Sequence, residues 1–236
     1  MAGHLVCRPA QSLPVALLRV RGDLDLSTGD ALRRAAERCL ADQPEALVID
    51  LAAARIADPA ALHVLAELIG DTRDWPDVPI VLCGPGMTAT DLGCAPITYA
   101  ESCDDALAEI ADEPEPRRIR VRLRPVPDAC RQARQLVAQA CGAWHRSETA
   151  AAATLVATEL VANVVRHAHT TMEFTLGLRN NQIWLSVSDR SRHLPQPADP
   201  GHSDVGGRGL RLVRELTEAW GVLPFSDGKV VWTRLA

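Results

Sequence analysis

The sequence predicts a two-domain α/β protein, and three observations support this prediction. The first half, to about residue 111, alternates short apolar runs with amphipathic helical segments. The run DEPEPRR at Asp112–Arg118 follows, and its two prolines among charges cannot continue a helix. The second half combines long helical patterns with paired strands and one glycine-rich loop. We therefore expect domains over 1–111 and 119–236, joined by a linker at 112–118.

The first domain is predicted to contain buried strands separated by helices. Apolar runs rich in β-branched residues predict the strands Val15–Gly22, Ala46–Leu51 and Val78–Gly84. Amphipathic patterns predict the helices Ser27–Gln43, Asp58–Trp75 and Glu101–Glu113. Ser27 or Thr28 is expected to cap the first helix, and Asp58 followed by proline to open the second. This order of elements implies parallel neighbours within one sheet.

The second domain is predicted to begin with a half-exposed strand, Ile119–Pro125, followed by two helices. These helices span Pro127–Trp144 and Ser147 to about Ala168. A hairpin is expected from Thr171–Arg179 and Gln182–Arg190, with its turn at Asn180–Asn181. The polar loop Ser191–Val205, a helix reaching about Trp220 and a final strand pair around Asp227–Gly228 complete the domain.

Composition excludes several classes of protein. The net charge of −5 is opposite to the basic surplus that nucleic-acid binding proteins show. No apolar stretch approaches the length of a membrane span, and the first residues lack the pattern of a signal peptide. The seven cysteines are scattered without a C-x-x-C pair, which indicates reduced thiols and neither a disulfide framework nor a zinc site. A cytoplasmic protein is the expectation.

The stretch TELVANVVRHAHT, residues 158–170, carries the first chemical signal. Glu159 and Asn163 lie four residues apart and share one helix face. Their oxygen atoms suit Mg²⁺, which usually takes its other ligands from water and phosphates. Glu159 is then placed to polarise a water or a hydroxyl beside the metal. Taken alone, such a pair is more often the solvated face of a helix.

The stretch VGGRGLRLV, residues 205–213, carries the second signal. Gly206, Gly207 and Gly209 stand where a loop enters a helix, so the backbone can approach an anion at the helix start. Alone, this pattern is more often a tight turn. Both stretches in this order, with Asp189 at a strand end between them, indicate a nucleotide site. The pattern fits neither a dinucleotide fold nor a Walker A loop. A Ser-His-Asp triad stays open, although no G-x-S-x-G motif exists.

The second half, from about Arg117 to Ala236, resembles the GHKL ATPase superfamily, in particular its bacterial anti-sigma factor serine kinases. ELVANVVRHAH resembles the asparagine box of that family, which implies Glu159 as general base and Asn163 as Mg²⁺ ligand. Asp189 matches the aspartate that hydrogen-bonds the adenine amino group. The resemblance implies an α/β sandwich that binds ATP and Mg²⁺ under a lid, the loop Ser191–Val205.

Two further parts of this resemblance concern the phosphates and the base. The second glycine box matches Gly207 and Gly209, with Gly206 and Arg208 beside them, and Thr233 is similar to a hydroxyl residue that helps to fix the adenine. The first glycine box of the family reads D-x-G-x-G. Here the corresponding residues are DRSRH, with no glycine, so the turn around the adenine must be built differently.

The first half, about Pro14 to Ala111, resembles a STAS domain, the fold of anti-sigma factor antagonists. GDLDLSTGDAL and LVIDLAAARIAD carry this resemblance. Phosphorylatable members have a serine two residues after the aspartate that precedes the next helix, and here that position is Ala60, after Asp58. An alanine has no hydroxyl, so the domain is expected not to be switched by phosphorylation at that position.

Two functions from different classes follow from the resemblance. The first is an ATP- and Mg²⁺-dependent serine protein kinase that acts on a separate STAS-domain anti-sigma factor antagonist and, by analogy, binds a sigma factor. The second is an ATP-binding but non-catalytic protein that sequesters its partners. A second copy of the chain is a further candidate partner, whereas nucleic acid and membrane are not.

Overall fold

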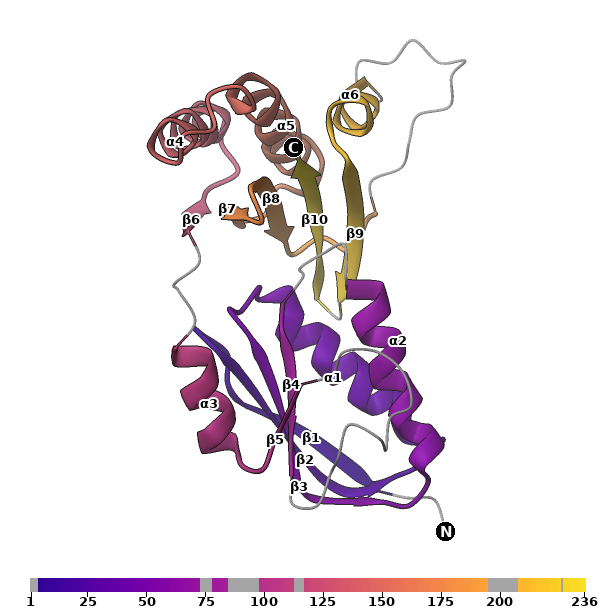
Figure 1. Ribbon diagram of the computed structural model, residues 1–236. Coiled ribbons are helices and arrows are strands. Elements are labelled where there is room, and N and C mark those ends of the chain that lie inside the picture. The colour runs from indigo at the N-terminus through magenta and orange to yellow at the C-terminus, as the bar shows by residue number, and fades with distance from the viewer. Residues whose placement is uncertain (1–3, 73–77, 85–97, 113–116, 195–207, 226) are drawn as a thin grey trace. The chain divides into compact units, whose positions relative to one another are not determined.

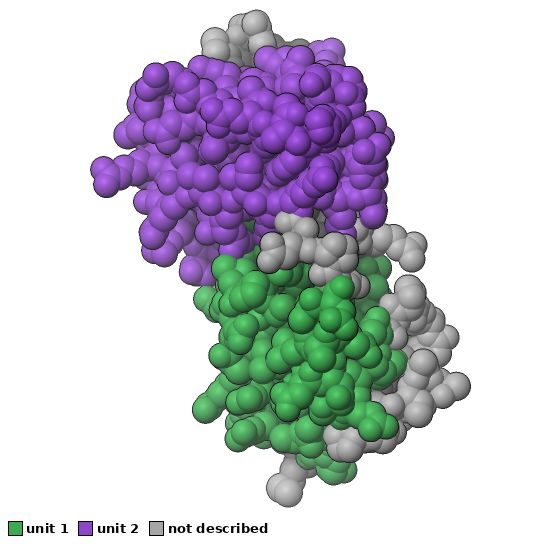
Figure 2. Space-filling model, turned by 60° about the vertical axis from the view of Figure 1, so that its left-hand side comes forward, with its two compact units in different colours: residues 1–115 green, residues 116–236 purple. Residues whose placement is uncertain are grey.

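The computed structural model describes residues 4–72, 78–84, 98–112, 117–194, 208–225 and 227–236. The chain forms two compact units, residues 1–115 and 116–236, which Figure 2 distinguishes by colour. Residues 113–116 of the predicted linker lie outside the described residues. Each unit contains one five-stranded sheet with helices packed against it, so the predicted α/β class is confirmed.

The sheet of the first unit is mixed, with the strand order β1-β2-β3-β4-β5. Strands β2 to β5 are parallel neighbours, as predicted, and β1 pairs antiparallel with β2. Neither β1 nor β5 was predicted, because β1 is interrupted by polar residues and a proline and β5 has only three residues. The bounds are β1 Leu5–Gln11, β2 Ala16–Leu24, β3 Leu47–Ile56, β4 Ile80–Cys83 and β5 Thr98–Ala100.

Helices cover both faces of this sheet (Figure 1). Helices α1 (Gly29–Ala41) and α2 (His63–Thr72) pack on one face, and α3 (Cys103–Ala111) packs on the other. Successive strand residues alternate between the two cores: Val48 contributes to the α3 side and Ile49 to the opposite side. Burial on both faces explains why the strands are continuous apolar runs in the sequence.

The two expected helix caps had different outcomes. Asp58 precedes a 3₁₀ turn, Pro59–Leu62, and its Oδ1 accepts the N–H of Ala60 at 2.9 Å, which confirms the predicted cap. The residue before α1 is Thr28, but its side chain makes no capping hydrogen bond. The carboxylate of Asp25 instead accepts hydrogen bonds from the N–H groups of Ser27 and Thr28. The turn before α1 is therefore stabilised by the side chain of its first residue.

The second unit is a two-layer sandwich. Its sheet is antiparallel throughout, with the order β6-β7-β8-β10-β9, and three helices cover one face (Figure 1). Among the described residues, side chains such as Val161, Phe174 and Val213 belong to one hydrophobic core. Asn180 and Asn181 adopt positive φ in the β7–β8 turn, as the predicted hairpin requires. The bounds are β6 Arg117–Leu123, α4 Asp128–Ala143, α5 Ala150–Asn163, β7 Met172–Arg179, β8 Gln182–Asp189, α6 Arg208–Leu216, β9 Ala219–Phe225 and β10 Gly228–Leu235.

The glycine helix is shorter than predicted. Helix α6 ends at Leu216, and Trp220, the predicted last residue, lies in β9. Strand β9 pairs with β10 along its whole length, and Glu218 N–H already donates to Arg234 O at 2.9 Å. These sheet hydrogen bonds replace the helical ones. Among the helices that the structure describes in either unit, none is long and apolar enough to cross a membrane.

Candidate functional site

Helix α5 presents Glu159 and Asn163 at its C-terminal end. Both side chains are half-buried, whereas Leu160 and Val161 between them are fully buried in the core, as the spacing predicted. The α-helix ends at Asn163 and continues as one π-helical turn, Val164–Ala168, where a continuous α-helix was predicted. Such turns inside helices are frequent at functional sites.

The carboxylate of Glu159 remains accessible. Its side chain is 27% exposed, and its one described ionic partner is Arg166, whose Nη2 lies 3.5 Å from Oε2. A long, partly exposed ion pair of this kind contributes little stability, so it does not hold the carboxylate in place. The side-chain amide of Asn163 makes no hydrogen bond to a described residue. Both groups are therefore available for a ligand.

Helix α6 approaches Glu159 at Gly209. A Cβ atom added at this position would overlap Oε2 of Glu159, so the absence of a side chain at Gly209 leaves room for this carboxylate in its present position. The structure thus brings together one residue from each of the two predicted stretches. Gly206 and Gly207 lie outside the described residues, as does most of the loop Ser191–Val205 after Leu194. Arg208 is the first residue of α6.

Asp189, the last residue of β8, is the most deeply buried carboxylate of the candidate site. Its side chain is 1% exposed, and Oδ1 accepts the N–H of Ser191 at 2.7 Å. Oγ of Ser191 in turn accepts the N–H of His193 at 3.3 Å. The turn that lacks the family's glycines is therefore built from side-chain-to-backbone hydrogen bonds.

Lys229 is a site residue that the sequence reasoning missed. It stands opposite Asp189 in the β8–β10 register, and its Nζ donates to Oδ1 of Asp189 at 2.9 Å and to Ser191 O at 3.1 Å. Its side chain is only 8% exposed. The chain contains no other lysine, so this was the signal in the sequence: one lysine inside the apolar strand pattern KVVW, with arginine everywhere else.

The second carboxylate oxygen of Asp189 keeps acceptor capacity. Oδ2 lies 2.9 Å from Nζ of Lys229, yet it is buried and accepts no hydrogen bond of good geometry from a described residue. An ionised carboxylate only accepts hydrogen bonds, so a buried N–H donor from a ligand would complete it. The amino group of adenine is such a donor, and the residue therefore fits the base that the family resemblance implies.

Thr233 does not lie beside Asp189. Thr233 pairs with Leu185 across the β8–β10 ladder and is four positions along β10 from Lys229, or roughly 13 Å. Its hydroxyl is fully buried and has no hydrogen-bond partner among the described residues. The strand register places Lys229, and not Thr233, opposite the aspartate, and a role of Thr233 at the adenine stays a prediction.

Comparison with known families identifies the class of each unit. Residues 123–234, which include most of the antiparallel sheet and the three helices that cover one of its faces, match the family described as Histidine kinase-like ATPase domain. The first unit, a mixed sheet with helices on both faces, matches the STAS domain over residues 9–91. The chain is thus a STAS domain followed by a histidine kinase-like ATPase domain.

Individual relatives match parts of the chain. Over 61 residues the chain is 44% identical to the anti-sigma-F factor antagonist RsfB of Mycobacterium tuberculosis, a match covering 25% of this chain and 50% of the relative. The chain thus spans about half the length of the curated relatives it matches.

Two solved structures also match. An anti-sigma factor antagonist from Mycobacterium paratuberculosis is 25% identical, with a TM-score of 0.40 over 46% of this chain and 96% of that one. The RsbU and RsbW domains of a Mycobacterium tuberculosis protein are 16% identical, with a TM-score of 0.40 over 50% of this chain and 32% of that one.

Proposed function

We propose that this protein is a regulator of the anti-sigma factor type whose C-terminal domain is an ATP- and Mg²⁺-dependent serine protein kinase. The observation that carries the proposal is the contact between Glu159 and Gly209. It puts a half-buried, accessible carboxylate against the first turn of α6, and the first N–H groups of a helix have no partner within the helix and can bind an anion. This contact supports the proposal that Glu159 acts as a base beside a phosphate-binding helix start.

Each site residue has a role in this proposal. Bound Mg-ATP supplies the phosphoryl group and neutralises the charge that develops during its transfer. Asp189 Oδ2 would accept a hydrogen bond from the adenine amino group, and the side-chain oxygen of Asn163 would hold the Mg²⁺ ion. The phosphates would be bound by the segment Gly206, Gly207, Arg208 and Gly209. Glu159 accepts, on its carboxylate, the proton of the attacking serine hydroxyl.

The proposed substrate is a separate STAS-domain anti-sigma factor antagonist. The match to RsfB, which is itself named an anti-sigma-F factor antagonist, supports an assignment to this kind of regulatory system. In the attached STAS domain the candidate acceptor position is Ala60, which is exposed at the start of the 3₁₀ turn. This domain therefore acts as a non-phosphorylatable regulator, and a sigma factor is the second proposed partner. We propose that both interactions take place in the cytoplasm, where thiols stay reduced.

A non-catalytic, partner-sequestering protein is the second candidate, and Lys229 favours it. Its ammonium group already neutralises Asp189, and a side-chain network replaces the glycines of the turn. A site arranged in this way would bind a base in a restricted geometry and retain the nucleotide as a structural ligand. Binding and transfer must therefore be measured separately.

The binding experiment compares melting temperatures with and without Mg-ATP. A ligand at 100 times its dissociation constant stabilises the folded state by about 2.7 kcal/mol, which raises the melting temperature by roughly 5 °C or more. The Asp189→Asn variant is expected to lose most of this ligand-induced shift, whatever its own stability. An unchanged melting curve of the wild type with saturating Mg-ATP would contradict nucleotide binding.

The transfer experiment follows labelled phosphate from ATP to a purified STAS-domain antagonist. Glu159→Gln should reduce transfer by about 100-fold or more while ATP binding is retained, because a general base acts in the transition state. Glu215→Gln, an exposed glutamate on α6, is the matched control and should behave like wild type. Equal transfer by wild type and Glu159→Gln would remove Glu159 from catalysis. Absence of transfer in both, with ATP bound, would favour the sequestering protein.

A further inference from the structure

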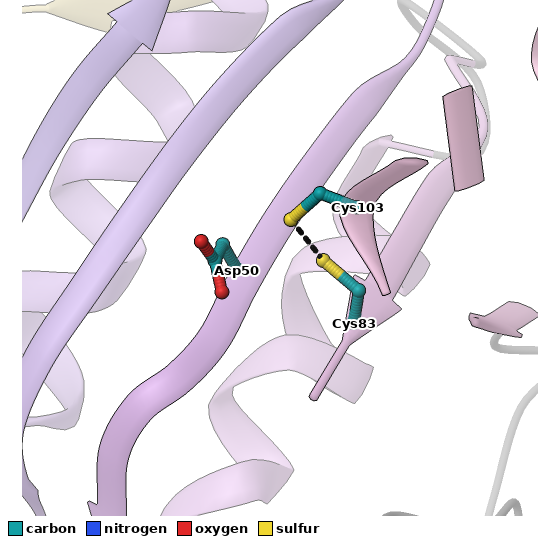
Figure 3. Close-up of side chains that lie close together, drawn as sticks. All are labelled: Asp50, Cys83 and Cys103. Atoms are coloured by element: carbon teal, nitrogen blue, oxygen red, sulfur yellow. Dashed lines mark hydrogen bonds between the residues drawn. The ribbon is translucent and has the colours of Figure 1, made fainter. Parts of the chain in front are cut away.

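Three side chains far apart in the sequence meet in the STAS unit. They are Asp50 of β3, Cys83 at the end of β4 and Cys103 at the start of α3 (Figure 3). The two Sγ atoms lie 2.8 Å apart, and all three ligand atoms lie within 4.8 Å of one another. The cysteines are 20 positions apart, so their spacing in the sequence did not indicate the contact.

The β3–β4 strand pair and the start of α3 hold these three residues close together. Asp50 and Cys83 are register partners in the parallel β3–β4 pair, so they lie side by side at one end of the sheet. Ser102 caps α3 by accepting the N–H of Asp105 at 3.1 Å, which holds Cys103 in the first turn of the helix. Cys83 is 1% exposed, whereas Cys103 is half-buried. One thiol is therefore reachable from solvent, and the other lies behind it.

The sulfur positions favour a covalent link over a shared metal ion. Two thiolates that bind one tetrahedral Zn²⁺ at about 2.3 Å lie about 3.7 Å apart. The two sulfurs are already closer than this, and in Figure 3 they point toward each other. Formation of a disulfide, with its S–S bond of about 2.05 Å, would bring the two sulfurs closer together. Binding of a shared metal ion would have to move them apart.

We propose that Cys83 and Cys103 are an oxidation site, and that they form a reversible disulfide joining the end of β4 to the first turn of α3. The oxidant is a small disulfide of the glutathione class. The half-buried Cys103 thiol, the more accessible of the two, loses its proton and attacks the oxidant, forming a mixed disulfide and releasing one thiol. Cys83 then loses its proton and attacks Sγ of Cys103, releasing the second thiol.

In this exchange two electrons pass from the protein sulfurs to the oxidant. The two protons end on the two glutathione molecules, and the carboxylate of Asp50 is the nearby acceptor for the first proton. Burial raises the pKa of both thiols, so the pair stays protonated at neutral pH and reacts only with an excess of oxidant. Such a pair remains reduced under ordinary cytoplasmic conditions and responds to a shift of the thiol–disulfide balance.

The test uses the full chain, fully reduced and then incubated with oxidised glutathione. We expect loss of two free thiols, an intact mass lower by two hydrogen atoms, and a digest in which the peptides of Cys83 and Cys103 are linked. The melting temperature of the STAS unit should rise by about 5 °C or more, because the bond restricts the unfolded chain. Dithiothreitol should reverse all four changes.

The variants decide between this pair and its alternatives. Cys103→Ser and Cys83→Ser should each abolish the link, and Cys7→Ser, which alters a half-buried thiol elsewhere, should leave it intact. Cys103→Ser is the decisive variant if the buried Cys83→Ser fails to fold. A stable glutathione adduct on Cys103, or a link that involves other cysteines, would overturn the proposal. Stoichiometric Zn²⁺ that is lost in Asp50→Asn would overturn it as well, since it would show that the carboxylate and the two thiolates are ligands of one metal ion.

Discussion

At the residue scale, the buried pair of Asp189 and Lys229 dominates the energetics of the candidate site. Taking both charges out of water is costly, and their mutual attraction offsets that cost only while both partners remain. Lys229→Met should therefore destabilise the second unit by about 3–5 kcal/mol, because it leaves the Asp189 carboxylate buried without its counter-ion. Urea denaturation of the variant measures this change.

The double variant Lys229→Met/Asp189→Asn is the companion measurement. Removing both charges should recover much of the lost stability, since neither charge then remains unpaired. Arg211→Gln, which breaks an exposed pair with Glu215, is the matched control and should cost less than about 1 kcal/mol. Additive effects of the two buried substitutions would show that the pair is not energetically coupled.

The residues of the site differ in how well the sequence could predict them. Glu159 and Asn163 share a helix face by their spacing alone, so a local pattern was sufficient. Lys229 meets Asp189 across two strands whose register is set by the β8–β10 ladder, and that register cannot be read from either strand. The role of Thr233 at the adenine stays a prediction, and this residue lies four positions further along β10 than Lys229.

At the scale of elements, the contact of α6 with α5 at Gly209 can be tested by a single methyl group. Gly209→Ala should displace the Glu159 carboxylate, since the new Cβ would occupy the position of its Oε2. Stability should change by less than about 1 kcal/mol, because alanine favours the helix and the flexible end of Glu159 can move. We expect the rate of phosphate transfer to the STAS-domain antagonist to fall several-fold more than the affinity for ATP, when both are measured in parallel.

Gly142→Ala supplies the control for that experiment. Gly142 lies on α4, and a Cβ there would meet no atom within 4 Å, so this variant gains the same helix propensity without a contact. Transfer by Gly142→Ala should equal that of wild type. If Gly209→Ala also transfers at the wild-type rate, the close approach of the two helices has no role in positioning the base.

Elements with strong local patterns were predicted well, and elements defined by their neighbours were not. The long helices α4 and α5 and the β7–β8 hairpin carry their own periodicity and turn residues. Strands β1 and β5 exist because an adjacent strand offers hydrogen-bonding groups, and the end of α6 is decided by the pairing of β9 with β10. Tertiary pairing of this kind leaves little trace in a single segment.

At the scale of the whole molecule, the two compact units make it possible to test what the STAS domain does for the kinase-like domain. A fused domain is present at an effective concentration near the millimolar range, provided that its linker permits contact. If it occupies the partner-binding face, a protein starting at Arg117 should bind an external STAS partner more tightly than the full chain. Titration calorimetry on both proteins measures the difference, and identical affinities would rule out this inhibitory role.

A hydroxyl introduced at position 60 tests whether the kinase-like domain can phosphorylate the attached STAS domain. Ala60 is exposed, and its N–H is held by Asp58, so Ala60→Ser would present a serine at the start of the 3₁₀ turn without disturbing the core. We expect Ala60→Ser to incorporate phosphate from ATP if the kinase is active, whereas wild type does not. The addition of Glu159→Gln should abolish that incorporation, and phosphate found elsewhere on the chain would contradict the assignment of this position.

The strand order also bears on how the protein avoids unwanted polymerisation. Each described sheet has two outer strands, β1 and β5 in one and β6 and β9 in the other, whose unpaired backbone groups could recruit a strand from another molecule. Strand β1 contains Pro9 and a break in register, β5 is only three residues long, β6 carries four arginines among its seven residues, and β9 contains Pro224. Prolines, short length and like charges all hinder strand addition. We therefore expect partners, including a second copy of the chain, to be recognised through helices and loops and not by extending a sheet.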